Sequence, residues 1–128
     1  MRHLGIDYGT KRVGLALSDE SGTMAFPHEV RENSGSLARD LATLCEREGV
    51  GTIVIGHSLD RTGQPNPVQA AVEELVTDLT LQTGLPVHLE PEQYTTQAAT
   101  RIQGRSAATD AAAAALILDS YLTRSKHP

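Results

Sequence analysis

The chain has 128 residues, 39% of them hydrophobic and 3% aromatic, and carries a formal net charge of −5 at pH 7. Domains commonly hold about 100–150 residues, so this length predicts one domain over residues 1–128, with a mainly aliphatic core. The negative charge is unfavourable for non-specific nucleic-acid binding, which depends on Lys and Arg. The 11 such residues are nevertheless enough to line one face of a small protein.

Cysteine content and apolar segments bear on the compartment. Cys45 is the single cysteine, which excludes an internal disulfide framework, and it falls in an apolar helical pattern typical of an unreactive core thiol. No stretch has the length of a membrane span, and no long apolar segment precedes the first predicted strand. We therefore expect a cytoplasmic protein with no membrane partner.

The first part of the sequence predicts three β-strands. Residues 4–8 and 13–18 are rich in aliphatic side chains and are separated by a polar turn that contains Gly9. A third strand is predicted over residues 28–31, after the turn at Gly22. Short connections of this kind favour an antiparallel meander.

Helices and strands then alternate. Residues 36–48 place apolar side chains on one helical face, with Gly49 at the expected C-terminal cap. The apolar run at residues 52–56 predicts a buried parallel strand. The next helix is expected to begin at Pro67, capped by Asn66, and to end at Gly84, before a strand at 85–89 and helices at 96–103 and 110–122. The pattern predicts an α/β fold, with a mixed five-stranded sheet covered by helices on both faces.

Three carboxylates stand near the predicted ends of strands and helices. Asp7 ends the first strand, Glu92 follows the last one, and Asp110 opens the last helix. Each has a structural alternative, because Asp often initiates a turn and acidic residues favour helix N-termini. If the three converge, their oxygens suit Mg²⁺ or Mn²⁺ better than zinc, which prefers His and Cys ligands.

Several basic residues are candidates for phosphate contacts. Lys11 and Arg12 lie in the first turn, beside Asp7. Arg101 and Arg105 share one face if the short helix continues past Gly104. Arg61 lies in the loop after the fourth strand, where substrate contacts are common. Exposed cations that only solvate a turn are the alternative interpretation.

The order and spacing of these features resemble the YqgF/RuvX family, bacterial proteins with an RNase H-like fold. The strongest part is residues 5–16, Gly-Ile-Asp-Tyr-Gly-Thr-Lys-Arg-Val-Gly-Leu-Ala. It is followed by Ile-Val-Ile-Gly at 53–56, by Glu92 with Thr95 and Thr96, and by Asp110 ahead of the alanine run. The resemblance extends over nearly the whole chain.

The resemblance implies a nuclease. It makes Asp7, Glu92 and Asp110 the catalytic carboxylates and the ligands of Mg²⁺ or Mn²⁺, in a two-metal site completed when substrate binds. It places Thr10, Lys11 and Arg12 near the substrate backbone. Processing of the 5′ end of pre-16S rRNA is the main function implied, with resolution of branched DNA at Holliday junctions as the alternative. The partner would be structured RNA or branched DNA, and the protein a monomer or homodimer.

Two further hypotheses stay open. Pro91 and Gln93 stand where the family usually has Asp and Arg around its second acid, which motivates a catalytically weak, nucleic-acid-binding assembly factor. The segment at residues 5–10 is also similar to the first phosphate-binding turn of actins and sugar kinases. Those proteins close two such domains over a nucleotide, whereas this length allows one.

Overall fold

The computed structural model describes residues 1–9, 11–57, 67–91 and 107–125. Its elements follow the order β1 (Arg2–Asp7), β2 (Arg12–Ser18), β3 (Ala25–Glu32), α1 (Leu37–Glu48), β4 (Val50–His57), α2 (Pro67–Thr83), β5 (Val87–Pro91) and α4 (Ala107–Ser125). The five strands form one sheet in the order β3-β2-β1-β4-β5. The β1–β2 and β2–β3 pairs are antiparallel, whereas β4 is parallel to both β1 and β5. The predicted mixed sheet, a meander plus two parallel strands, is confirmed.

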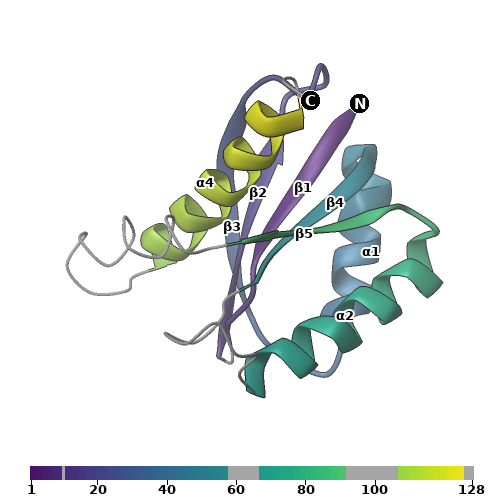
Figure 1. Ribbon diagram of the computed structural model, residues 1–128. Coiled ribbons are helices and arrows are strands. Elements are labelled where there is room, and N and C mark those ends of the chain that lie inside the picture. Colours follow the sequence, from purple (N-terminus) through teal and green to yellow (C-terminus); the bar gives the residue numbers. More distant parts are fainter. Residues whose placement is uncertain (10, 58–66, 92–106, 126–128) are drawn as a thin grey trace.

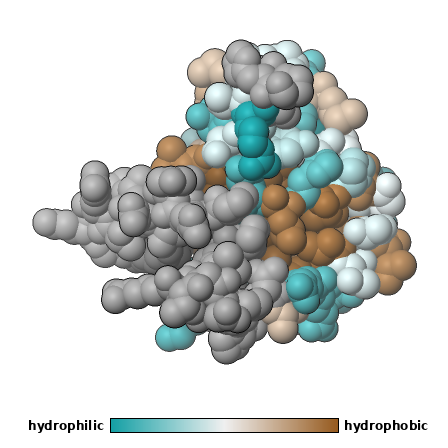
Figure 2. All heavy atoms as spheres, viewed as in Figure 1, coloured by the Kyte–Doolittle hydropathy of each residue, from teal (hydrophilic) through white to brown (hydrophobic). Residues whose placement is uncertain are grey.

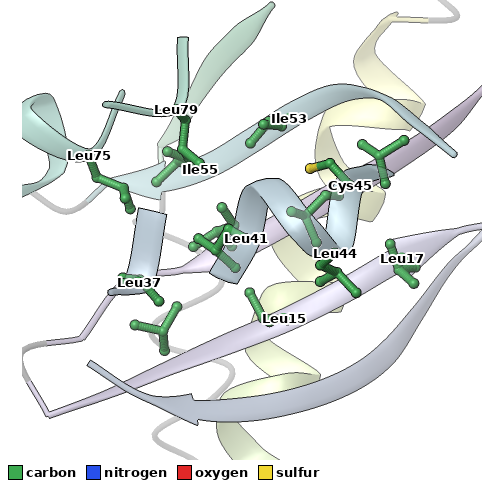
Figure 3. Close-up of a cluster of buried hydrophobic side chains, with 14 of the residues drawn as sticks. Leu15, Leu17, Leu37, Leu41, Leu44, Cys45, Ile53, Ile55, Leu75 and Leu79 are labelled. Carbon is green, nitrogen blue, oxygen red and sulfur yellow. The ribbon is translucent and has the colours of Figure 1, made fainter. Parts of the chain in front are cut away.

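Helices cover both faces of this sheet: α1 and α2 lie on one side and α4 on the other (Figure 1). Aliphatic side chains from alternate positions of β1, β2 and β4 point toward α1 and α2 and form the larger core cluster with them (Figure 3). The smaller cluster, between the sheet and α4, contains Ala16, Val54, Ala114, Ile117, Leu118 and Leu122. The sheet therefore has two buried faces, as its apolar strands require.

Local signals set the helix ends. Gly49 follows α1 in the left-handed conformation, with φ 68°, and its N–H donates to the Cys45 carbonyl. Gly84 follows α2 in the same conformation, with φ 69°. Both helix C-termini were predicted from these glycines, and the start of α2 at Pro67 is confirmed.

Other boundaries were predicted wrongly. β3 covers Ala25–Glu32, twice the predicted length, because its pairing with β2 extends the strand through polar and proline-containing sequence. β5 begins at Val87 rather than at residue 85, because its pairing with β4 starts with Val87 opposite Ile53. α4 begins at Ala107, since the alanines before Asp110 are strong helix formers, so Asp110 does not open the helix. The predicted helix at 96–103 lies outside the described residues.

Within the described residues, no helix is both long and apolar enough to cross a membrane. Figure 2 shows hydrophobic residues gathered in the middle of one face of the molecule, on the side where β5 runs in Figure 1. Leu89 of β5, an edge strand of the sheet, is 39% exposed.

Candidate functional site

Asp7 ends β1 and is 4% exposed. Successive side chains of a strand point to opposite faces. Leu4 and Ile6 belong to the core cluster under α1 and α2. Gly5 faces α4, since a Cβ atom built on it would lie 2.7 Å from the Leu118 Cβ. The same alternation places Asp7 on the α4 face, at the C-terminal end of β1.

Glycines flank Asp7 on both neighbouring strands. Asp7 is paired with Gly14 of β2 on one side and with Gly56 of β4 on the other. Neither neighbour has a side chain to cover the carboxylate, and glycine in a strand often marks a place where another group approaches the backbone closely. The two positions paired with Asp7 in this row of the sheet therefore contribute no side chain beside the buried acidic group.

Glu90 of β5 continues this row, because it is paired with Gly56. Neighbouring strands lie about 4.8 Å apart, so the Cα atoms of Asp7 and Glu90 are separated by about 10 Å. Glu90 is 3% exposed. Its Oε1 accepts a hydrogen bond from Ser120 Oγ at 3.3 Å, and its Oε2 lies 2.5 Å from Arg124 Nη2 of α4. The Arg124 contact is an ion pair without hydrogen-bond alignment.

Glu90 was missed in the sequence analysis, which singled out Glu92. A signal was present: within β5, Val87 and Leu89 alternate with His88 and Glu90, which predicts a second, polar side of the strand. That side faces α4, since His88 stacks on Tyr121 with the ring centroids 5.3 Å apart.

The direction of α4 shows that its first turns lie toward the Asp7 end of β1. Tyr121 lies near His3, with ring centroids 6.0 Å apart, and Ala114 and Leu118 lie over Gly5. The helix therefore runs antiparallel to β1, from its C-terminal toward its N-terminal end (Figure 1). Asp110 belongs to α4 one helical turn before Ala114, which is the direction of the Asp7 end. The Asp110 side chain lies outside the described part of the structure.

Lys11 and Arg12 lie where the β1–β2 connection joins β2, whereas Asp7 precedes this connection. Both basic side chains are exposed. Together with Glu32 and Asn33 they line an open hollow of about 600 Å³. This is the one part of the predicted phosphate-contacting surface that the described residues contain. Thr10, Arg61, Glu92, Arg101 and Arg105 lie outside them.

The predicted metal ligands also lie partly outside the described residues. Among the described residues, no group of three or more His, Cys, Asp and Glu side chains is arranged to hold a metal ion. The predicted set of Asp7, Glu92 and Asp110 has only its first side chain in that part of the chain.

Among the described residues, burial is the main cause of a pKa shift in His3 and in Cys45, both away from Asp7. Burial is the main cause that lowers the pKa of His3 below 6.5, and the positive N-terminus and His88 act in the same direction. Burial also raises the pKa of the Cys45 thiol to about 11. Cys45 is 3% exposed and belongs to the core, as its helical pattern predicted. A thiol with so little thiolate is a poor nucleophile.

Comparison with known proteins gives a consistent match. The family described as "RuvX: Holliday junction resolvase" matches residues 1–124. A protein of Anaplasma marginale named "Putative pre-16S rRNA nuclease" is 35% identical over 98% of this chain and 86% of its own length. A protein of the same name from Moorella thermoacetica is 38% identical, over 97% of this chain and 96% of its own.

Solved structures agree on the fold. The T. thermophilus RuvC in complex with Holliday junction substrate superposes with a TM-score of 0.67 at 17% identity, covering 99% of this chain and 97% of that one. The fowlpox virus Holliday junction resolvase gives a TM-score of 0.59 at 13% identity, covering 97% and 99%. The predicted RNase H-like fold is thereby confirmed.

Proposed function

This chain belongs to the RuvX family, and from that membership we propose that it is a metal-dependent endonuclease that processes the 5′ end of pre-16S rRNA in the cytoplasm. The observation that carries the proposal is the setting of Asp7. A buried carboxylate lies between two glycines, on the face of the sheet covered by α4, at the end of β1 where α4 begins.

The donor set fits a hard divalent cation. Asp7, Glu92 and Asp110 would hold Mg²⁺ or Mn²⁺ through carboxylate oxygens, the ligands these ions prefer. The glycines beside Asp7 support this fit, since neither contributes a side chain next to the carboxylate. When bound, a pair of such ions lowers the pKa of an attacking water and stabilises the leaving oxygen of a phosphodiester.

The chain's other residues would bind and orient the nucleic acid. Lys11 and Arg12 would neutralise backbone phosphates beside Asp7, with Thr10 adjacent to them in sequence. Arg61, Arg101 and Arg105 are proposed to extend that contact. Phosphate contacts carry no base identity, so they would fix the register of the substrate rather than its sequence.

Asp7→Asn tests the proposal directly. The change keeps the size of the side chain and removes its charge, and even second-shell changes at metal sites cost about 10- to 100-fold. We expect Mn²⁺-dependent cleavage of a pre-16S rRNA fragment to fall at least about 100-fold, with the melting temperature nearly unchanged. Asp119→Asn, the same substitution at an exposed position of α4, is the matched control and should cleave like the wild type. Cleavage by Asp7→Asn at the wild-type rate would refute the assignment.

Resolution of Holliday junctions is the second candidate, favoured by the description of the matching family. It predicts a homodimer, because symmetric cleavage of two strands requires two active sites, whereas RNA processing is compatible with a monomer. Parallel assays on a four-way DNA junction and on the pre-16S rRNA fragment separate the two. A wild-type protein that binds either substrate without metal-dependent turnover would instead favour the weak, non-cleaving assembly factor.

A further inference from the structure

Asn33 connects the end of β3 to the β1–β2 connection. The last rung between β2 and β3 is Arg12 opposite Glu32, and Asn33 is the next residue. Its backbone N–H donates to the Lys11 carbonyl at 2.9 Å, which continues the ladder beyond that rung. Its side-chain Nδ2 donates to the Gly9 carbonyl at 2.8 Å. One residue therefore contacts the chain on both sides of position 10.

The backbone that Asn33 contacts is tightly folded. A Cβ atom at Gly9 would lie 2.4 Å from the Arg12 carbonyl oxygen, so the chain approaches itself there more closely than any other residue type would allow. The Nδ2 bond satisfies the Gly9 carbonyl, which is part-buried and costly to leave unpaired. The direction in which Lys11 and Arg12 leave the backbone is thus fixed relative to β3.

These two cations line the open hollow of about 600 Å³, and Asn33 forms part of its wall. Lys and Arg side chains lose rotamer freedom when they bind a phosphate, and a fixed backbone limits the additional loss. Given the proposed function, we infer that Asn33 is a positioning residue that orients Lys11 and Arg12 toward a phosphodiester of the nucleic-acid backbone seated in this hollow.

The test measures the binding and cleavage of a structured pre-16S rRNA fragment by variants of Asn33. Asn33→Ala removes one hydrogen bond to the connection, and we expect the dissociation constant and the KM to rise about 2- to 10-fold, with kcat at saturating RNA nearly unchanged. Ser34→Ala, in the same loop, is the matched control, since its Oγ contacts Ser36 instead. Asn33→Ser, whose hydroxyl is too short to reach Gly9, should behave like Asn33→Ala.

A double-mutant cycle separates positioning from general stability. If Asn33 acts through the two cations, Asn33→Ala should change RNA binding less than about 2-fold in a Lys11→Ala/Arg12→Ala background. An undiminished effect in that background, or wild-type affinity in Asn33→Ala itself, would overturn the inference while leaving the nuclease assignment intact. Wild-type protein that neither binds nor cleaves the RNA would overturn both.

Discussion

His3 lies on β1 with its ring near Tyr121 of α4 and near the Met1 carbonyl, 3.2 Å from its Nδ1. Burial lowers the pKa of His3 in the folded protein below 6.5, with smaller contributions from the N-terminal charge and His88. The unfolded chain therefore binds a proton more readily than the folded one. The stability that this group contributes is fully present above pH 6.5 and is lost as the pH falls through the lowered pKa.

We accordingly expect His3→Gln to make the free energy of unfolding less dependent on pH between about pH 7.5 and 5.5, a range that spans the ordinary histidine pKa. Urea unfolding at several pH values across that range measures the effect. A His3→Gln profile as steep as that of the wild type would show that His3 is not responsible.

At the scale of elements, α4 packs closely against β1 at Gly5. A Cβ there would lie 2.7 Å from the Leu118 Cβ and 3.0 Å from the Ala114 carbonyl oxygen. Neither is the free end of a flexible side chain, so the helix must move to accommodate a methyl group. The alanine run allows this contact, because small side chains let a helix backbone come close to the sheet.

Gly5→Ala should destabilise the protein by about 1–3 kcal/mol, the usual cost of overpacking a core. It should also lower the cleavage rate, since any displacement of α4 changes its relation to Asp7. Denaturant unfolding and single-turnover cleavage measure the two effects. Gly35→Ala is the control, because a Cβ there meets nothing within 4 Å and its φ is not positive. Equal stability of the two variants would show that α4 is not closely packed at this point.

At the scale of the whole molecule, the alternation of strands and helices was readable from the sequence, because most of its elements have a clear apolar pattern, either a periodic one or a continuous run. Helix ends marked by Gly49 and Gly84 were predictable, since the left-handed conformation favours glycine. The extent of β3 was not, because pairing with β2 rather than local propensity extends it.

The sequence allowed single residues of the candidate site to be proposed, but it did not predict how the residues around Asp7 are arranged. The position of Asp7 at the end of an apolar strand also fits a turn residue, and Asp7 was selected because Glu92 and Asp110 follow it at the spacing of the family that the sequence resembles. That its row contains Gly14, Gly56 and Glu90 depends on strand register across β2, β4 and β5, which no local pattern specifies. The contact of Asn33 with Gly9 joins residues 24 positions apart and was likewise invisible in the sequence.

Because the net charge is −5, we expect nucleic-acid affinity to depend on a local cationic surface. If Lys11 and Arg12 each neutralise one phosphate, replacing either with Ala should reduce the slope of log K against log salt by about 1. Arg47→Ala is the matched control, because it changes the net charge by the same amount. Arg47 lies in the last turn of α1, on the face of the sheet opposite α4.

Affinity for the structured RNA measured between about 50 and 300 mM NaCl gives these slopes, because counterion release dominates that range. An unchanged slope in Arg47→Ala, beside reduced slopes in Lys11→Ala and Arg12→Ala, would show that the contact is local to the β1–β2 connection. Equal reductions in all three would mean that overall charge, rather than this surface, determines binding. In that case Lys11 and Arg12 would not be the phosphate contacts beside Asp7. The proposed carboxylate site could still be correct, with the RNA backbone bound at another surface.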